Sequence, residues 1–350
     1  MSRVPPGPVP WLPEAVARAA SRIYTWEVDR RSRAYDRGTG VTTLDIPVVS
    51  IGNLSVGGTG KTPMVEHMVR TLVDAGRRPC IAMRGYRSRG GVSDEAEEYR
   101  DGLAGLVPGP GLPIVAQPDR IAGIREAAKH ATFDCVVLDD GFQHRKIARA
   151  CDIVLADATR PFTADAPLPC GWLREPIRSL SRATAIVVTR ADLSEDAGHS
   201  LMEASHRAHP SAILASCALE WTQLRVVGVD GHSRRENIHW LRGKPVVACS
   251  AIGNPAAFLH RLSREVGEPL MGTLTLRDHD PYAQAAASRL LELARSKHAE
   301  TVVVTRKDWM KMRSRQWPFE VAYPIVGVRW LDEPAGRAIE EHVLAACSTT

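Results

Sequence analysis

The sequence predicts an α/β protein in which helices cover both faces of a mostly parallel sheet. Short apolar segments rich in β-branched residues alternate with longer stretches that show helical periodicity. Strands that are apolar along their whole length are typical of parallel sheets, because both faces of such strands are buried. The chain has 350 residues, 44% of them hydrophobic, and this length suggests two domains.

The first series of predicted strands begins after residue 40. Helices are predicted between these strands over 62–76 and 119–130, and Asp119 stands where an N-cap residue is expected. The predicted strands of this series are 46–52, 78–83, 112–116, 134–139, 152–157, 185–189 and 212–219.

A second α/β series begins near residue 225, with predicted helices near 255–266 and 282–297. This restart predicts an N-terminal segment (1–40), a first α/β domain (41–222) and a second, smaller α/β domain (223–350). The predicted strands of the second series are 225–229, 245–252, 269–276, 301–305 and 324–330.

The N-terminal segment predicts a basic amphipathic helix. Its apolar residues recur at roughly helical spacing, and residues 1–40 carry seven arginines against four acidic residues. Such a helix suits the interface of an anionic membrane, but the same pattern also suits packing against the body of the protein. The sequence leaves both interpretations open. The apolar stripe consists of Val16, Ala19, Ala20, Ile23 and Trp26.

The composition argues against several other classes of protein. A net charge of +5 is no nucleic-acid signature by itself. The seven cysteines form no CxxC pair, so we expect buried thiols in a reducing compartment and no zinc site. The sequence contains no apolar run of roughly 20 residues and no signal-peptide core, so we expect a cytoplasmic protein that touches at most a membrane surface.

The segment SVGGTGKT, from Ser55 to Thr62, predicts a phosphate-binding P-loop between a strand and a helix. Its glycines allow backbone N–H groups to surround a phosphate, and the following helix N-terminus favours negative charge. Lys61 would reach the β- and γ-phosphates, and Thr62 would place its hydroxyl on magnesium. The first position departs from the general GxxxxGKT pattern, because Ser55 replaces glycine.

The segment DCVVLDDGFQH, 134–144, predicts a second part of the same site. Its apolar strand ends in Asp139 and Asp140, as a Walker B strand does. Carboxylates at this end of the strand can approach magnesium held by the P-loop.

An ordered series of motifs resembles the tetraacyldisaccharide 4'-kinase family, the lipid A 4'-kinases. These motifs follow one another in the order of the family and span roughly residues 46 to 310. They are IGNLSVGGTGKTP (51–63), RGYRSRG (84–90), SDE (93–95), QPDR (117–120), DDGFQH (139–144), LPCGWLREP (168–176), IGNPAAF (252–258), DHDPY (278–282) and TRKD (305–308).

The resemblance implies a P-loop NTPase-like α/β/α domain, a second smaller α/β domain and a basic N-terminal helix near the membrane. It implies transfer of the γ-phosphate of ATP, with Mg²⁺, to the 4'-hydroxyl of tetraacyldisaccharide 1-phosphate in lipid A biosynthesis. The partners would be this acylated disaccharide phospholipid and the inner face of the inner membrane, and no nucleic acid. No protein partner can be named from it. The implied nucleotide-binding residues are Ser55, Val56, Gly57, Gly58, Thr59, Gly60, Lys61 and Thr62.

The resemblance also implies individual roles. Asp94 matches the acid that accepts the proton of the attacking sugar hydroxyl, and His279 matches its imidazole partner, with Lys61 as the third catalytic residue. A base of this kind must lie within hydrogen-bond reach of the hydroxyl. His144 matches a histidine beside the phosphates or the metal. The implied magnesium ligands are Thr62, Asp139, Asp140 and Glu175.

The chain departs from the family pattern at four positions. Ser93 precedes Asp94 where the family has glycine, and Cys170 and Trp172 change the segment before LREP. Arg306 replaces an acid in the TRKD motif, so a carboxylate role there is in doubt.

Three other classes of function remain open. The segment TRAD, Thr189 to Asp192, resembles a guanine-reading signature and favours a P-loop GTPase or metallochaperone-type switch, although Arg190 replaces its lysine. A nucleotide-dependent binding protein without catalysis would tolerate the loss of Asp94. A ligase on the same scaffold is not distinguished by the P-loop alone.

Overall fold

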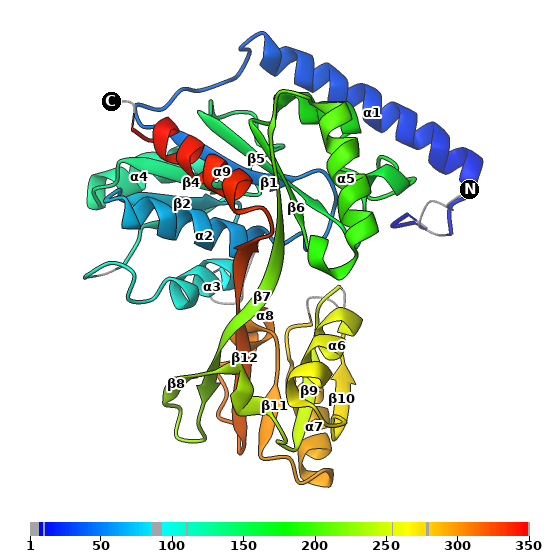
Figure 1. Cartoon of the computed structure of the whole chain (residues 1–350), viewed down its shortest axis with the longest axis vertical. Helices are drawn as coiled ribbons and strands as arrows, with labels where there is room; N and C mark the ends of the chain where they lie inside the picture. Colours follow the sequence, from blue (N-terminus) through cyan, green and yellow to red (C-terminus); the bar gives the residue numbers. More distant parts are fainter. Residues whose placement is uncertain are drawn as a thin grey trace. The chain divides into compact units, whose positions relative to one another are not determined.

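The chain forms two compact units that are built from separate stretches of sequence (Figure 1). The computed structural model describes residues 7–9, 11–85, 93–109, 111–253, 255–277 and 280–348. The domain limits predicted at residues 40 and 222 remain a prediction. The first unit comprises Met1–Tyr86, Leu103–Leu219 and Val328–Thr350, and the second comprises Arg87–Gly102 and Glu220–Gly327.

The first unit contains a parallel sheet in the order β7-β6-β5-β1-β4-β2-β3. Every neighbouring pair in this series is parallel, and all six residues of β1 and all five of β4 are buried. The strands are β1 (Val48–Asn53), β2 (Pro79–Met83), β3 (Ile114–Ala116), β4 (Cys135–Asp139), β5 (Cys151–Asp157), β6 (Ala185–Thr189) and β7 (Ile213–Val227).

Helices cover both faces of this sheet. The connection from β1 to β2 runs across the sheet in one direction, and the connections from β3 to β4 and from β6 to β7 run in the other. Because such crossovers are right-handed, α2 lies on the face opposite α4 and α5. Ile124 of α4 packs in one cluster with Val136, and Leu201 of α5 packs in another with Ile186. The helices are α2 (Lys61–Asp74), α4 (Arg120–His130), α5 (Glu195–Ala208) and α9 (Glu333–Ala346).

The N-terminal helix α1 (Glu14–Asp36) packs on the first unit through a face that differs from the predicted apolar stripe. Ala17 and Ser21 are buried, and the Ser21 hydroxyl donates to the carbonyl of Pro167 at 2.9 Å. The Tyr24 hydroxyl donates to the carbonyl of Arg174 at 2.8 Å. Three large apolar residues within α1 are more than half exposed: Val16, Ile23 and Trp26.

The second unit has a sheet in the order β10-β9-β11-β12-β7-β8, to which β7 contributes its C-terminal part. Strand β9 is parallel to β10 and β11, and β8 is antiparallel to β7. The further strands are β8 (Ser233–Glu236), β9 (Val246–Ser250), β10 (Gly272–Thr275), β11 (Thr301–Val303) and β12 (Glu320–Trp330). The helices are α3 (Asp94–Gly102), α6 (Pro255–Val266), α7 (Gln284–Ser296) and α8 (Arg306–Met312).

The predicted fold class is confirmed, although several elements differ: α3, α5, α8 and α9 were not among the predicted helices. The segments 212–219 and 225–229 were expected as separate strands, but β7 runs through both. Polar residues interrupt the apolar pattern near 220–223, yet Trp221 and Leu224 remain buried, so the backbone stays extended. Helix α3 was not predicted, because its acidic sequence has only a weak apolar periodicity. Asp119 caps α4 as predicted, and its carboxylate accepts from the N–H of Ala122 at 3.1 Å.

The structure bears on the expectations about membrane spans and about the cysteines. Within the described ranges, no helix is both long enough and apolar enough to cross a bilayer. All seven cysteines are free thiols, and six of them are buried as expected, whereas Cys170 is half-buried.

Candidate active site

The P-loop connects β1 to α2 at the carboxyl edge of the sheet. Gly57 and Gly60 have φ angles of 130° and 88°, which side chains with a Cβ atom rarely adopt. A Cβ atom on Gly60 would also lie 2.5 Å from the side chain of Leu219. Gly57 and Gly58 are exposed and have open space where a Cβ would stand. The loop therefore has an exposed glycine backbone that a phosphate can approach.

Three hydrogen bonds hold the loop from different elements. The Asn53 side chain donates to the Thr59 hydroxyl at 2.9 Å, and the Thr189 hydroxyl donates to the Thr59 carbonyl at 3.0 Å. The N–H of Val56 donates to the carbonyl of Trp172 at 2.8 Å. Asn53 and Thr189 were not predicted as site residues, although Asn53 lies in the first family-like motif and Thr189 opens the TRAD segment.

The two aspartates of the Walker B strand lie beside the P-loop because β4 pairs with β1. Asp139 is opposite Ile51 in the register, and Asp140 follows at the end of the strand. Nζ of Lys61 lies 3.5 Å from Oδ1 of Asp140. The structure therefore brings together Lys61, Asp140 and, one residue away, Asp139, as the sequence predicted.

Asp140 carries its charge in a partly buried position. Burial by itself raises the pKa of this carboxyl, but Lys61, Arg174 and Arg120 together bring its pKa below the usual value. Nη1 of Arg174 donates to both carboxylate oxygens, at 2.7 and 2.9 Å. Asp140 also has a φ of 50°, an uncommon conformation for a residue other than glycine. Such local strain persists only where the surroundings enforce it.

The turn that follows β4, residues 139–144, packs directly on β1. A Cβ atom on Gly52 would lie 2.6 Å from Cβ of Phe142, and one on Gly141 would lie 2.4 Å from the Ser50 hydroxyl. The Gln143 side chain donates to the carbonyl of Asn53 at 2.9 Å. The close approach of these backbones places the turn against the strand that leads into the P-loop.

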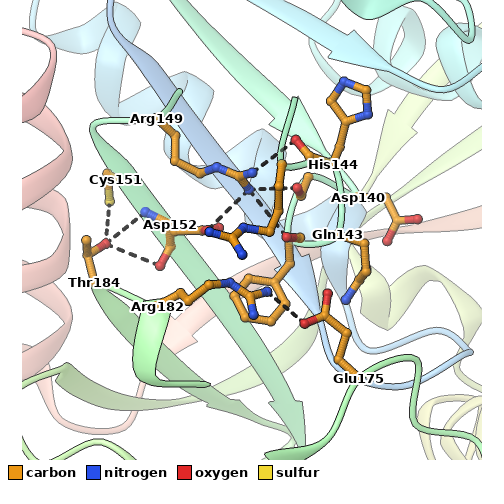
Figure 2. Close-up of polar contacts among 12 residues, drawn as sticks. Asp140, Gln143, His144, Arg149, Cys151, Asp152, Glu175, Arg182 and Thr184 are labelled. Atoms are coloured by element: carbon orange, nitrogen blue, oxygen red, sulfur yellow. Dashed lines mark hydrogen bonds and ion pairs between the residues drawn. The ribbon is translucent and has the colours of Figure 1, made fainter. Parts of the chain in front are cut away.

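Four arginines surround this turn, and we call them the arginine cage: Arg120, Arg149, Arg174 and Arg182. Arg149 donates to the carbonyls of Gly141 and His144 at 2.8 and 3.0 Å, and it pairs with Asp152 at 3.2 Å (Figure 2). The Arg120 guanidinium lies 3.3 Å from the carbonyl of Asp140. The Arg182 guanidinium lies 4.4 Å from the centre of the Phe142 ring. Arg120 and Arg149 bind main-chain oxygens of the turn, whereas Arg174 binds the Asp140 carboxylate.

Two further predicted site residues lie near the cage. His144 is half-buried, and burial, followed by the charges of Arg120 and Arg149, lowers its pKa to about 4, so the ring is neutral near pH 7. Its Nε2 makes no hydrogen bond to the described residues. Glu175 is buried and its carboxylate accepts from Arg182 at 2.8 Å (Figure 2). The roles assigned to both from the resemblance stay predictions.

The TRAD segment has a structural role at the end of β6. Arg190 forms an ion pair with Asp157, and Asp157 also accepts from the Thr159 hydroxyl at 2.7 Å. The Thr189 hydroxyl holds the P-loop, as described above. The residue that replaces the lysine of a guanine-reading signature therefore pairs with an aspartate of the neighbouring strand.

The two residues expected to handle the substrate proton fall outside the first unit or outside the described residues. Asp94 is half-buried and is the first residue of α3, in the second unit. His279 and Asp278 lie outside the described residues, as do Asn254 and residues 86–90 of the RGYRSRG motif. The proposed pairing of Asp94 with His279 stays a prediction.

The oxygen atoms beside the P-loop suit magnesium. Thr62 offers a hydroxyl in the first turn of α2, and Asp139 and Asp140 offer carboxylates at the adjacent strand end. Within the described ranges, no group of three or more His, Cys, Asp or Glu side chains forms a preassembled metal site. Magnesium commonly uses one or two carboxylates and completes its shell with phosphate oxygens and water, so this donor set fits it.

The parallel sheet, the glycine-rich loop with Lys61 and the adjacent Walker B aspartates define a P-loop protein of the phosphoryl-transfer class. The model of the tetraacyldisaccharide-1-P 4'-kinase family matches residues 14–344. The chain belongs to this family, and it is a phosphotransferase, as the motifs predicted.

Individual relatives agree over most of the chain. A tetraacyldisaccharide 4'-kinase of Chlorobaculum parvum is 36% identical over 312 residues, which are 84% of this chain and 83% of the relative. One of Geobacter metallireducens is 36% identical over 316 residues, which are 85% of this chain and 88% of the relative. A crystal structure of LpxK from Aquifex aeolicus in complex with ATP matches with a TM-score of 0.73 and 25% identity, covering 95% of this chain and 99% of that one.

Proposed function

We propose that this chain transfers the γ-phosphoryl group of ATP to the 4'-hydroxyl of tetraacyldisaccharide 1-phosphate, with magnesium. The observation that carries the proposal is the family match over residues 14–344, which includes both the P-loop and the Walker B turn. The short separation of Lys61 and Asp140, 3.5 Å, supports it, because both residues lie where the terminal phosphates of a P-loop nucleotide bind.

The first unit supplies the nucleotide site in this proposal. Backbone N–H groups of residues 55–60 would bind the phosphates, and Lys61 would stabilise the charge on the transferred group. Thr62, Asp139 and Asp140 would hold magnesium, which neutralises phosphate charge when it is bound. The ion pair with Lys61 lowers the pKa of Asp140, which favours the charged carboxylate that a metal ligand requires.

The second unit supplies the base. Asp94 would accept the proton of the 4'-hydroxyl as the oxygen attacks phosphorus, and His279 would orient Asp94 or take up the proton. Because catalytic phosphoryl transfer depends mainly on positioning and electrostatics, a base of modest strength is sufficient when it is well placed.

We also propose that α1 brings the protein to the inner face of the inner membrane, where an acylated disaccharide resides. The side chains of Ile23 and Trp26 are 68% and 59% exposed, although they are large and apolar. Arginines flank them along the helix, as in helices that lie in an anionic interface. The packing of Ala17, Ser21 and Tyr24 on the body leaves this surface available to lipid.

A phosphoryl-transfer assay tests the function. Purified protein is incubated with labelled ATP, magnesium and tetraacyldisaccharide 1-phosphate in detergent, with the Lys61→Ala variant as control. We expect label at the 4'-position with the wild type and almost none with the variant. Transfer to another acceptor but not to this lipid would overturn the proposed substrate. GTP hydrolysis without any lipid product would favour a P-loop GTPase switch.

Binding to vesicles tests the membrane contact. Wild-type protein should cosediment with vesicles that contain anionic lipid, and the double variant Ile23→Ser, Trp26→Ser should bind them less. The same substitutions should leave activity on a detergent-dispersed substrate nearly unchanged. Equal vesicle binding by both proteins would refute a role for this surface.

A further inference from the structure

Helix α3 carries the proposed base at its first position and acidic residues along its length. It runs from Asp94 to Gly102, and Ser93, which replaces the glycine of the family pattern, accepts a long hydrogen bond (3.5 Å) from the N–H of Ala96. A serine N-cap and acidic residues in the first turn both stabilise a helix start. Because Asp94 lies in this first turn, its position depends on how α3 is held.

The second unit holds α3 through side chains of α8 and its C-terminal flank, of β12 and of β7, from which Arg225 lies 4.0 Å from Asp101. Nε of Arg306 lies 3.4 Å from Oε1 of Glu98, and Arg313 pairs with Glu97 at 2.7 Å. The Tyr323 hydroxyl donates to the Asp101 carboxylate at 3.0 Å. The acidic residues at 97, 98 and 101 therefore all face groups of the second unit.

The Arg306–Glu98 pair is the most buried of the ion pairs that hold α3. The side chains of Arg306 and Glu98 are 7% and 16% exposed, whereas Arg313 is 42% exposed. Charges shielded from water interact more strongly, and removing one partner leaves the other uncompensated. Exposed pairs such as Arg313–Glu97 contribute far less.

The position of Arg306 in its own helix supports a specific partnership. Arg306 is the first residue of α8, where the helix dipole disfavours a positive charge. Two hydrogen bonds fix the start of α8: the Thr305 hydroxyl accepts from the N–H of Asp308 at 3.2 Å, and the buried Asp308 carboxylate accepts from Ala251 at 3.1 Å. The backbone of Arg306 is therefore fixed, and its guanidinium pairs with the carboxylate of Glu98.

We propose that Arg306 is a positioning residue of the reaction, which holds α3, and with it Asp94, on the second unit through Glu98. This inference rests on the proposed function of Asp94 as the base. Arg306 of the TRKD motif would then have a different role from a carboxylate at the same position. It would act on the base through α3 and would not contact the substrate.

The test compares substitutions at this pair with a matched exposed pair. The variants are Arg306→Gln and Glu98→Gln, with Arg306→Lys as the conservative change. Arg207→Gln is the control, because the Arg207–Glu203 pair on α5 has the same 3.4 Å separation but is 69% and 65% exposed. The measurements are kcat, KM for ATP, and amide hydrogen exchange of residues 97–102.

We expect Arg306→Gln and Glu98→Gln to lower kcat about tenfold and to speed amide exchange in α3, while KM for ATP stays within about twofold. Arg306→Lys should recover part of kcat, and Arg207→Gln should behave as the wild type. Unchanged exchange in α3, or a loss of ATP binding that matches the loss of kcat, would overturn the proposal.

Exchanging the charges of Arg306 and Glu98 distinguishes loss of their ion pair from general destabilisation of the protein. Arg306→Glu places two acids together, Glu98→Arg places two arginines together, and the double variant restores an opposite pair. The double variant should exceed the kcat of either single variant, since interacting residues couple in a double-mutant cycle. Additive losses would count against the pair.

A loss of the proposed function and a loss of the positioning role give different experimental results. If the wild type phosphorylates no lipid, the proposed function fails, yet amide exchange still shows whether Arg306 holds α3. If the wild type is active and the Arg306→Gln variant is slow with normal exchange in α3, the positioning role fails while the function stands. If Arg306→Gln does not fold, Glu98→Gln carries the same test from the more exposed partner.

Discussion

The turn after β4 and helix α3 are attached to the protein in different ways. The backbone of the turn at 139–144 is held by Arg120 and Arg149, which donate to its main-chain oxygens, and Arg174 adds a side-chain pair with Asp140. Helix α3 is bound through its side chains, by pairs whose exposure ranges from 7% at Arg306 to 42% at Arg313. Hydrogen bonds to main-chain oxygens hold the backbone of the turn whatever side chains it carries. The side-chain pairs of α3, in contrast, can each be removed by a single substitution.

This difference in attachment is consistent with the function that we propose for each region. In our proposal the turn supports Asp139 and Asp140 as magnesium ligands, and magnesium tolerates little deviation from its preferred ligand distances. In our proposal helix α3 carries Asp94 as the base for the acceptor hydroxyl, and attachment through separate side-chain pairs is compatible with this role. We therefore expect lesions in the turn to affect nucleotide binding or stability, and lesions in α3 to affect turnover.

The largest effect should come from the base. Asp94→Asn should lower kcat by about 10²–10⁴-fold, because the amide cannot accept the hydroxyl proton. ATP binding should stay as in the wild type, since Asp94 belongs to the second unit. Steady-state kinetics and calorimetric ATP titration measure both quantities. A variant that retains more than half of the wild-type kcat would remove Asp94 from the reaction.

The next effect should come from the P-loop lysine. Lys61→Ala should lower kcat by about 10²–10³-fold and weaken ATP binding as well, because Lys61 contacts both the phosphates and Asp140 in our proposal. The same two assays apply. Weakened ATP binding in Lys61→Ala, against normal binding in Asp94→Asn, is the contrast that supports the division between the two regions.

The arginine cage should matter for stability. Arg149→Met should lower the free energy of unfolding by about 3 kcal/mol, because it removes donors from two carbonyls and leaves buried Asp152 without its partner. Chemical denaturation measures the change. The double variant Arg149→Met, Asp152→Leu should be less destabilised than the sum of its singles, and strict additivity would contradict the coupling.

Asp152 makes the cage sensitive to pH. Burial raises the pKa of Asp152 to about 6, so the folded state holds a proton that the unfolded state releases near pH 4. Its contribution is favourable at low pH and is lost as the pH rises through 6. The stability advantage of the wild type over Asp152→Asn should therefore shrink by about 3 kcal/mol between pH 4 and 7. An advantage that is constant over this range would show that burial does not control this carboxyl.

The smallest effect should come from the exposed attachment of α3. Arg313→Gln should change the free energy of unfolding by less than about 1 kcal/mol, because its pair with Glu97 is open to solvent. Denaturation in low and high salt measures it, since screening should remove the difference. A loss as large as that of Arg306→Gln would mean that burial does not rank the attachments of α3.

Much of the site was accessible from sequence because its signals are local. The P-loop glycines, Lys61 and Thr62 are neighbours in the chain, and Asp139 and Asp140 follow an apolar strand directly. Asn53, Thr189 and Arg149 were missed because their roles depend on contacts across the sheet, to Thr59 and to the carbonyls of the turn. A polar residue beside a strand end gives no sign of its partner until the strand order is known.

The sequence by itself determined the α/β class, the P-loop, the aspartates at the end of the Walker B strand and the family. Hydrophobic periodicity and contiguous motifs are local features, so they can be read without the tertiary structure. Tertiary structure alone decided that β4 lies beside β1, which brings Asp140 to Lys61. It also decided that Ile23 and Trp26 of α1 stay exposed, and that Arg306 meets Glu98 across 208 positions of the chain. Contacts between residues so far apart depend on how the chain packs, and no local pattern encodes them.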